Sequence, residues 1–245
     1  MNLLMKKSLA QIVKDDHRAA LVFEKYNLDF CCKGKRSLQQ ACDDGKLPAS
    51  EITAALERIR IENPHNSMFN YELFSLKQLV NYILSTHHDY VKRELPQILS
   101  WLQRVVNKHG EHHPEMVKVM ALFEAMNEEM TEHMNKEELI LFPRIIAVEE
   151  SSLLSQANQL NNTYLTAPIE MMEQEHDHAG NLLAEIRMLT NNYTLPEDGC
   201  TTYRLVINSL QAFEKDLHQH VHLENNVLFP RALELFTGAA NSKLN

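Results

Sequence analysis

The residues best suited to chemistry in this sequence occur twice, in the same order and at the same spacing. His133 is followed by Glu137 and then by Phe-Pro-Arg, and His220 and Glu224 repeat this H-x3-E-x4-F-P-R pattern without a gap. On a helix, residues four positions apart lie on the same side, one turn apart. Two such helices facing each other would bring together two imidazoles and two carboxylates. This set of groups is more typical of a pair of metal ions than of a hydrophobic core.

The repeat includes one more histidine in each half of the chain. His88 precedes His133 by 45 residues, His176 precedes His220 by 44, and an aspartate follows each of these lone histidines. The adjacent His87 is excluded because only His88 matches the second half. Two carboxylates that bridge two metals, with two imidazoles on each metal, would use the whole set. The predicted ligands are His88, His133, Glu137, His176, His220 and Glu224.

The donor types restrict the metal without selecting it. Imidazole and carboxylate suit iron, manganese or zinc. A ligand set without thiolate argues against a structural zinc site, which is often rich in cysteine. Ferritin-like di-metal sites use Glu-x-x-His with the glutamate first. Here the histidine precedes the glutamate by four positions, an order that resembles hemerythrin-like domains.

Helical spacing of apolar residues supplies the elements that would hold these ligands. Apolar residues recur at helical spacing over about 75–108, 114–148, 168–191 and 201–235. Pro96 is expected to kink or divide the first of these helices. Two short connections and one long one, 149–166, fit an antiparallel hemerythrin-like four-helix bundle. We assign residues 63–74 to a linker, 75–236 to the bundle and 237–245 to a C-terminal tail.

Residues 1–62 are expected to form a small helical domain of their own. Ser8 is placed to cap a first helix that continues to about Tyr26, Ser37 opens a second helix, and Pro48 precedes a third. The predicted fold class is therefore all-α, with the small N-terminal cysteine-containing domain followed by the bundle. A domain this short is marginally stable alone and needs packing, a metal or a dimer partner.

Composition excludes several classes of protein. The net charge of −9 argues against binding to nucleic acid or to an anionic membrane surface. No stretch reaches the roughly 18 apolar residues of a membrane span. The first residues do not form a secretory signal, so a cytoplasmic location with four reduced cysteines is expected. Adjacent Cys31 and Cys32 are poorly placed to form a disulfide with each other.

The cysteine pair has a functional and a structural interpretation. Positive charge from Lys33, Lys35 and Arg36 would favour a thiolate, which could accept nitric oxide, bind iron transiently or exchange disulfides. Alternatively, the pair belongs to a turn in which one cysteine packs in the small core. We favour the functional role, and we expect the isolated Cys42 and Cys200 to be structural.

The sequence resembles the repair-of-iron-centres family of iron–sulfur cluster repair proteins. The resemblance rests on the segment from Asp29 to Gly34 (Asp-Phe-Cys-Cys-Lys-Gly) upstream of the paired H-x3-E-x4-F-P motif, and it covers nearly the whole chain. It implies a non-haem di-iron protein, with two oxo- or hydroxo- and carboxylate-bridged iron ions on the six residues named above. It also implies a homodimer made under nitrosative or oxidative stress, and it places Glu129 and Glu175 near the site or along a path for iron.

Several functions are compatible with these features. The main hypothesis is repair of damaged iron–sulfur proteins, with the labile di-iron centre supplying iron. The alternatives are an enzyme that binds or reduces nitric oxide, and a carrier or sensor of O2 or nitric oxide; whether the protein is an enzyme stays open. A cysteine-containing N-terminal domain argues against a simple carrier, which does not need one. A helical adaptor without metal is disfavoured by the repeat.

Overall fold

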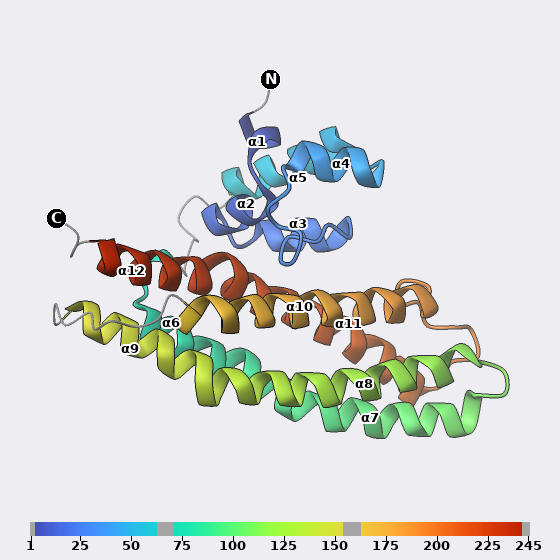
Figure 1. Cartoon of the computed structure of the whole chain (residues 1–245). Helices are drawn as coiled ribbons and strands as arrows, with labels where there is room; N and C mark the ends of the chain where they lie inside the picture. Colours follow the sequence, from blue (N-terminus) through green and yellow to red (C-terminus); the bar gives the residue numbers. More distant parts are fainter. Residues whose placement is uncertain (1–2, 63–70, 154–162, 242–245) are drawn as a thin grey trace.

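The computed structural model describes residues 3–62, 71–153 and 163–241, and these residues are almost entirely helical (Figure 1). Five short helices form an N-terminal unit, and long helices form a bundle beneath it. Ser8 and Ser37 additionally form an isolated antiparallel bridge. The predicted all-α class is confirmed.

The N-terminal helices begin where the capping residues predict. They are α1 (Leu3–Lys6), α2 (Leu9–Asp15), α3 (Ala19–Lys25), α4 (Leu38–Gly45) and α5 (Ala49–Glu62). The Ser8 hydroxyl accepts a hydrogen bond from Gln11 N at 3.1 Å, and Ser37 forms a capping box with Gln40. The single first helix expected up to Tyr26 is wrong, because the chain breaks between α2 and α3. Asp16 is extended there, and its carboxylate accepts hydrogen bonds from the backbone and side chain of Arg18.

The bundle contains four long helical rods, three of which include a π-helical turn. The first rod is α6 (Leu76–Ile83), η2 (Leu84–His88) and α7 (Asp89–His109), preceded by the 3-10 turn η1 (Tyr71–Leu73). The second is α8 (Glu115–Lys136), η3 (Glu137–Leu141) and α9 (Phe142–Leu153). The third is α10 (Thr163–Leu189), and the fourth is α11 (Thr201–Leu223), η4 (Glu224–Leu228) and α12 (Phe229–Asn241). In the bundle α8 packs on α7 and α10, and α11 packs on α7.

Pro96 and Pro168, at which the sequence suggested a kink or break and a helix start, both lie inside continuous helices. Pro96 does not divide the first rod, because α7 continues through it and the irregular turn is η2 instead. Pro168 does not start the third rod, which begins at Thr163. A proline inside a helix leaves the carbonyl four residues earlier without its usual donor. For Pro168 that carbonyl belongs to Tyr164, and it accepts a hydrogen bond from Arg144 Nη1 at 2.9 Å.

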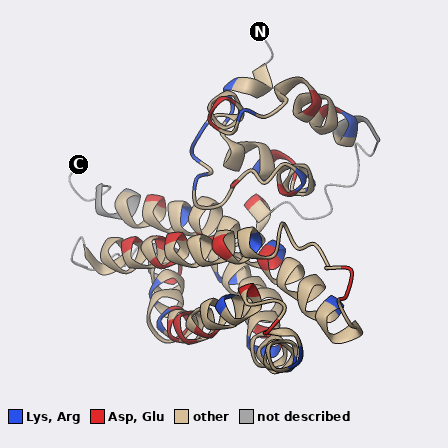
Figure 2. Ribbon diagram, turned by 90° about the vertical axis from the view of Figure 1, so that its right-hand side faces the viewer, with Lys and Arg blue, Asp and Glu red and all other residues tan. Residues whose placement is uncertain are grey.

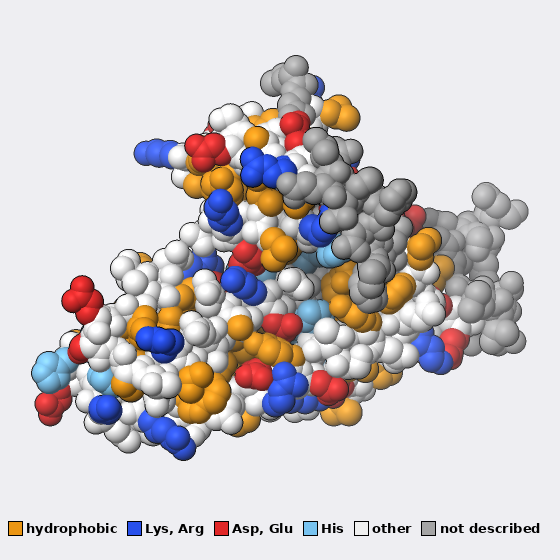
Figure 3. All heavy atoms as spheres, turned by 180° about the vertical axis from the view of Figure 1, so that it is seen from behind, with side chains coloured by type: hydrophobic (Ala, Val, Ile, Leu, Met, Phe, Trp, Pro, Cys, Tyr) orange, Lys and Arg blue, Asp and Glu red, His pale blue; other side chains and the backbone are white. Residues whose placement is uncertain are grey.

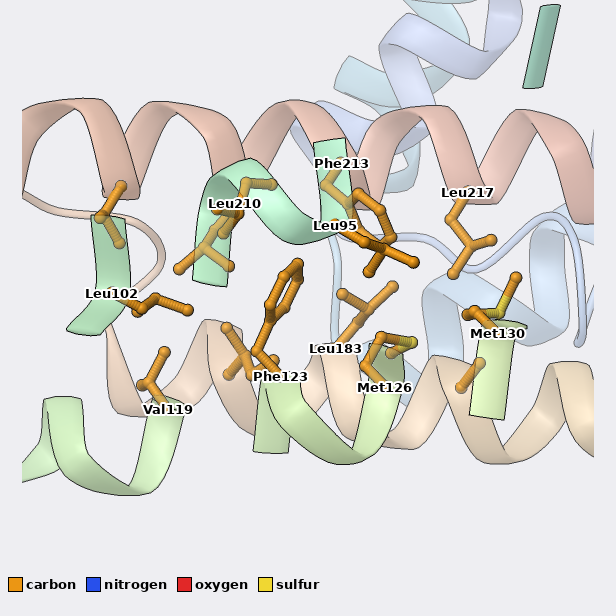
Figure 4. Packing of buried hydrophobic residues seen from close by; sticks show 14 of the residues in the cluster. Leu95, Leu102, Val119, Phe123, Met126, Met130, Leu183, Leu210, Phe213 and Leu217 are labelled. Atoms are coloured by element: carbon orange, nitrogen blue, oxygen red, sulfur yellow. The ribbon is translucent and has the colours of Figure 1, made fainter. Parts of the chain in front are cut away.

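Two hydrophobic clusters fill the bundle and leave a polar layer between them. In the first, Phe123 and Phe213 meet edge to face, with Leu183 and Met126 beside them (Figure 4). The second, towards the other end of the rods, includes Phe142 and Phe229. Each rod crosses from one cluster to the other at the predicted ligands.

The N-terminal helices stand on the bundle as a separate lobe (Figures 1 and 3), with histidine and hydrophobic side chains visible at the junction in Figure 3. Phe30, buried in the N-terminal core, also contacts the rings of His218 and His222 of α11, with ring centroids 6.1 and 5.7 Å away. Basic and acidic residues are interspersed along the helices (Figure 2). In the described part of the chain, each helix is too short or too polar to cross a lipid bilayer.

Candidate metal centre

The six predicted ligands come together in the polar layer of the bundle. Their side chains are nearly inaccessible, with exposed fractions of 0–2%. Glu137 and Glu224 each begin a π-helical turn, and His88 ends one. His176 lies within the uninterrupted α10. The sequence pairing of His88 rather than His87 with the site is therefore consistent with the geometry, although the assignment of all six as ligands stays a prediction.

The ligands form two overlapping donor sets. One contains His88 and His220, the other contains His133 and His176, and both include Glu137 and Glu224. Glu224 Oε1 lies 2.9 Å from His220 Nε2, and Glu224 Oε2 lies 3.2 Å from His176 Nε2. Each oxygen of this carboxylate therefore faces a different set. The arrangement is suited to two cations bridged by two carboxylates.

Proline accounts for the π turns of the second and fourth rods, although not for that of the first. Pro143 and Pro230 follow the turns η3 and η4 as the second residues of α9 and α12. A proline ring would clash with the carbonyl four residues earlier in a regular α-helix. A wider turn relieves that contact, and π-helical turns are frequent at functional sites. The Phe-Pro part of the repeat thus helps to place the glutamates.

Three of the four histidines have a fixed ring orientation. His88 Nδ1 is 2.7 Å from Glu138 Oε1, His133 Nδ1 is 2.9 Å from Glu175 Oε2, and His176 Nδ1 is 2.8 Å from Asn225 Oδ1. Because these partners are acceptors, the Nδ1 atoms carry the protons and the Nε2 lone pairs face the interior. Such partners orient metal-binding imidazoles and make them better ligands.

The donors fit a metal because they are buried without other partners. His88 Nε2, both oxygens of Glu137 and Glu224 Oε2 make no hydrogen bond. The Nε2 atoms of His133 and His176 lie 3.0 Å apart. Two neutral imidazoles would point lone pairs at each other at that distance. Buried polar groups of this kind are costly unless a cation binds them.

Electrostatics at the centre favour positive charge. Burial disfavours the charged form of His88, but the close carboxylates of Glu137 and Glu224, 3.3 and 3.9 Å from its Nε2, prevail and raise its pKa to about 10. Burial likewise opposes charge on His176, yet Glu224 raises its pKa to about 9. Burial lowers the pKa of His220 to about 3. Burial also opposes the charge on Glu224, whose pKa is nevertheless held well below its ordinary value by the neighbouring histidines.

The secondary candidates Glu129 and Glu175 lie in different surroundings. Glu175 bonds His133 and also accepts from Lys136 Nζ at 2.5 Å; the hydrogen bond from His133 is the main cause that lowers its pKa to about 2. Glu129 pairs with His178 on the surface at 3.1 Å. Both glutamates line a cavity of about 290 Å³ that also reaches His133. Among the six predicted ligands, His133 alone lines this cavity.

The cysteine pair lies on the bundle next to a ligand. Cys32 Sγ is 3.6 Å from the backbone oxygen of His176, and both cysteines line a cavity of about 450 Å³ between the lobe and the bundle. Asp29 Oδ1 accepts hydrogen bonds from the backbone N–H groups of the next turn and from Cys31 Sγ. The expected activation of both thiols is wrong for Cys31. The neighbouring Cys32 sulfur, burial and the charge of Asp29 raise the pKa of Cys31 well above 9.0.

Three neighbours of the ligands were not predicted from the sequence. Glu138 and Asn225 each directly follow a glutamate shared by the two donor sets, and His87 precedes His88; all three lie against a histidine of these sets. Their position beside the repeated motif was the available signal. Cys42 is buried in the N-terminal core, as expected, whereas Cys200 lies 3.2 Å from His109 Nε2 at the far end of the bundle.

Comparison with known proteins agrees with this geometry. Residues 79–232 match the family model of the hemerythrin HHE cation binding domain, and residues 5–60 match ScdA_N, a domain of unknown function (DUF542). The iron-sulfur cluster repair protein YtfE of Yersinia pestis (strain Pestoides F) is 38% identical over 216 residues, which cover 88% of this chain and 91% of the relative. YtfE of Yersinia pseudotuberculosis serotype O:1b (strain IP 31758) matches equally well. The chain therefore belongs to the hemerythrin HHE family, in the group that joins this domain to an ScdA_N domain and includes the YtfE proteins.

Proposed function

We propose that this protein binds two iron ions per chain and repairs damaged iron–sulfur clusters by supplying iron to them. The observation that carries the proposal is the pair of donor sets that share Glu137 and Glu224. Both sets use the same two carboxylates, which supports two ions held side by side over one ion alone. The relatives named for iron-sulfur cluster repair span nearly the same length and support the assignment of iron and of the task.

The residues around the centre suit an iron site that can release its iron. Bound iron would supply redox chemistry and a transferable ion. Carboxylate oxygens hold such ions with hard, exchangeable contacts. When an ion leaves, His88 and His176 can hold protons beside Glu137 and Glu224, because these carboxylates favour the charged rings. Metal binding and release would therefore be coupled to protons.

We further propose that Cys31 and Cys32 receive iron or a nitrosyl group during repair. The cavity that both cysteines line also touches His176. The pair is therefore adjacent to the proposed iron site and accessible from the surface. Asp29 joins them in a third group of possible metal donors. Glu129 and Glu175 line a second cavity that touches His133, which supports the expectation that they lie along a path for iron. The family resemblance extends this proposal to a cytoplasmic homodimer that acts under nitrosative or oxidative stress and meets nitric oxide or O2.

The decisive experiment follows iron from this protein to a damaged client. The purified protein is expected to contain about two antiferromagnetically coupled irons per chain by Mössbauer spectroscopy. Iron should pass to an aconitase-type enzyme with a nitric oxide-damaged cluster as its activity returns. If the iron stays in place while nitric oxide is consumed, the function is nitric oxide chemistry instead. No iron, or a single zinc, would overturn the proposal.

Two sets of variants distinguish iron binding from the transfer of iron to a client. Glu137→Leu and Glu224→Leu each remove a shared ligand and are expected to lower the iron content below two per chain. Unchanged iron content and spectrum in both would contradict the ligand assignment. Cys31→Ala combined with Cys32→Ala is expected to retain the iron but to restore clusters poorly. Full restoration by that double variant would make the pair structural.

A further inference from the structure

The two halves of the metal centre orient their histidines by a common rule. In each half, the residue after the shared glutamate bonds Nδ1 of the lone histidine: Glu138 bonds His88, and Asn225 bonds His176. For the histidine of the H-x3-E pair, the partner of His133 is Glu175, the residue directly before a lone histidine. The same rule assigns the partner of His220 to position 87.

Position 87 breaks the rule because it holds a histidine. The His87 ring lies parallel to that of His220, with centroids 5.4 Å apart and planes inclined by 5°. Stacked rings cannot form the edge-on hydrogen bond that Glu175 forms, and His220 Nδ1 is buried without a partner. His87 Nδ1 instead bonds Asp216 Oδ1 at 3.0 Å.

Asp216 has a buried oxygen without a partner, and His220, one helical turn away, has a buried nitrogen without a partner. It precedes His220 by four residues on α11 and so lies one turn away on the same side. Asp216 Oδ2 is buried without a hydrogen bond. The equivalent residue of the other half, Glu129, pairs with His178 at the surface, with 44% of its side chain exposed against 20% for Asp216. Asp216 is therefore directed inward where its counterpart is not.

We infer that Asp216, held by His87, is the positioning carboxylate of His220 and sets the affinity of the metal position formed by His88 and His220. A carboxylate behind a metal-binding imidazole fixes its tautomer and strengthens it as a ligand. The two metal positions are inequivalent, because both histidines of the other position have direct partners. The ion between His88 and His220 is the weaker one and leaves first. This inference rests on the proposed two-metal function.

Stepwise Co2+ binding tests the inference without using repair activity. Visible absorption of the metal-free protein during titration is expected to resolve two binding steps. Asp216→Leu should weaken the weaker step by up to about 100-fold, and Asp216→Asn, which keeps an acceptor like that of Asn225, by about tenfold. The stronger step should not change in either variant. Glu128→Leu, at an exposed position of α8, is the control and should change neither step.

Two further single variants show which Co2+ binding step belongs to which metal position. Glu138→Gln should weaken the same step as Asp216→Leu, whereas Glu175→Gln should weaken the other step. In proton NMR spectra of the Co2+ protein, one exchangeable, hyperfine-shifted imidazole N–H signal should be lost in Asp216→Leu. A purely structural role would leave that signal in place.

The outcomes distinguish this inference from the proposed function. If the wild-type protein binds fewer than two Co2+ ions, the two-metal function itself fails. If it binds two, and Asp216→Asn and His87→Phe leave both steps and all imidazole signals unchanged, only the role of Asp216 is overturned. His87→Phe keeps the stacked ring while removing its hydrogen bond, so it remains informative should Asp216→Leu fail to fold.

Discussion

The thiol of Cys31 illustrates how burial can reverse the effect of nearby positive charge. Lys33, Lys35 and Arg36 follow it in sequence, but Arg36 pairs with Asp44 and Lys35 with Glu173. The thiol itself is buried and faces Cys32 and Asp29, neither of which favours a thiolate. The charges of residues close in sequence were thus a poor guide to the electrostatic environment of the Cys31 thiol.

The raised pKa of Cys31 predicts slow alkylation at neutral pH. Relative to the unfolded chain, iodoacetamide labelling of Cys31 should be suppressed at pH 7.5 and should increase above pH 9. Because the folded pKa exceeds the unfolded value, the associated stability is present below pH 9 and is lost as pH rises through the folded pKa. Peptide mass spectrometry after timed labelling measures the rate.

Asp29→Asn is the matched variant for this prediction. It keeps an oxygen that can accept from the N–H groups of Cys31 and Cys32 but removes the negative charge. Labelling of Cys31 should become faster, with its pH dependence moved downward. A rate and pH profile equal to wild type would mean that Asp29 does not influence the thiol.

The arginines of the F-P-R triplets connect one helix to the backbone of another segment. Arg144 binds the carbonyl that Pro168 leaves free in α10. Arg231 donates to the backbone oxygens of Tyr71 at 3.2 Å and Phe74 at 2.7 Å, and so fixes the chain where it enters α6. One short motif therefore contains the predicted ligands, a π turn and an arginine that binds backbone carbonyls of a neighbouring segment.

Loss of the Arg231 contacts should reduce stability without emptying the metal centre. Hydrogen bonds from a charged donor are worth about 1.5–3 kcal/mol each, so the loss of two in Arg231→Ala is expected to lower the free energy of unfolding by about 3–6 kcal/mol. Urea unfolding of the metal-loaded protein measures the change. Arg231→Lys, which cannot reach both carbonyls with a planar fork, should be intermediate. A loss below about 0.5 kcal/mol would place Arg231 among ordinary surface residues.

Element types and the six inward donors followed from the sequence because they depend on local periodicity and on the repeat. The break at Asp16 and the early start of α10 did not, because each depends on one side chain meeting a particular backbone group. The role of His87 was missed for a similar reason. Only the packing of η2 against α11 shows that its ring lies on His220.

At the scale of the whole molecule, the N-terminal lobe contacts the bundle next to the predicted metal ligands. Glu24 Oε1 lies 2.7 Å from His218 Nδ1, and Asn226 Nδ2 donates to the backbone oxygen of Cys31 at 3.1 Å. Both contacts use bundle residues that neighbour His220 or Glu224 in sequence. Such long-range contacts could not be predicted from the sequence, because nothing in either local pattern specifies its partner.

Weakening this attachment from the lobe side should expose the cysteine pair while leaving the metal centre filled. Glu24→Gln removes one charge of a largely buried ion pair and changes no residue of the bundle. A loss of about 1 kcal/mol in docking corresponds to roughly fivefold more of the open form, so Cys32 should be labelled about fivefold faster. Glu51→Gln, in the first turn of α5 and exposed, is the control and should label like wild type.

Iron content measured on the same samples should stay at its wild-type value in both variants. If Glu24→Gln instead lost iron, the lobe would be part of what holds the metal rather than a cover over the cysteines. If neither labelling nor iron changed, the ion pair would not hold the lobe on the bundle, and other contacts, such as those of Phe30, Asn226 and Cys32, would have to do so.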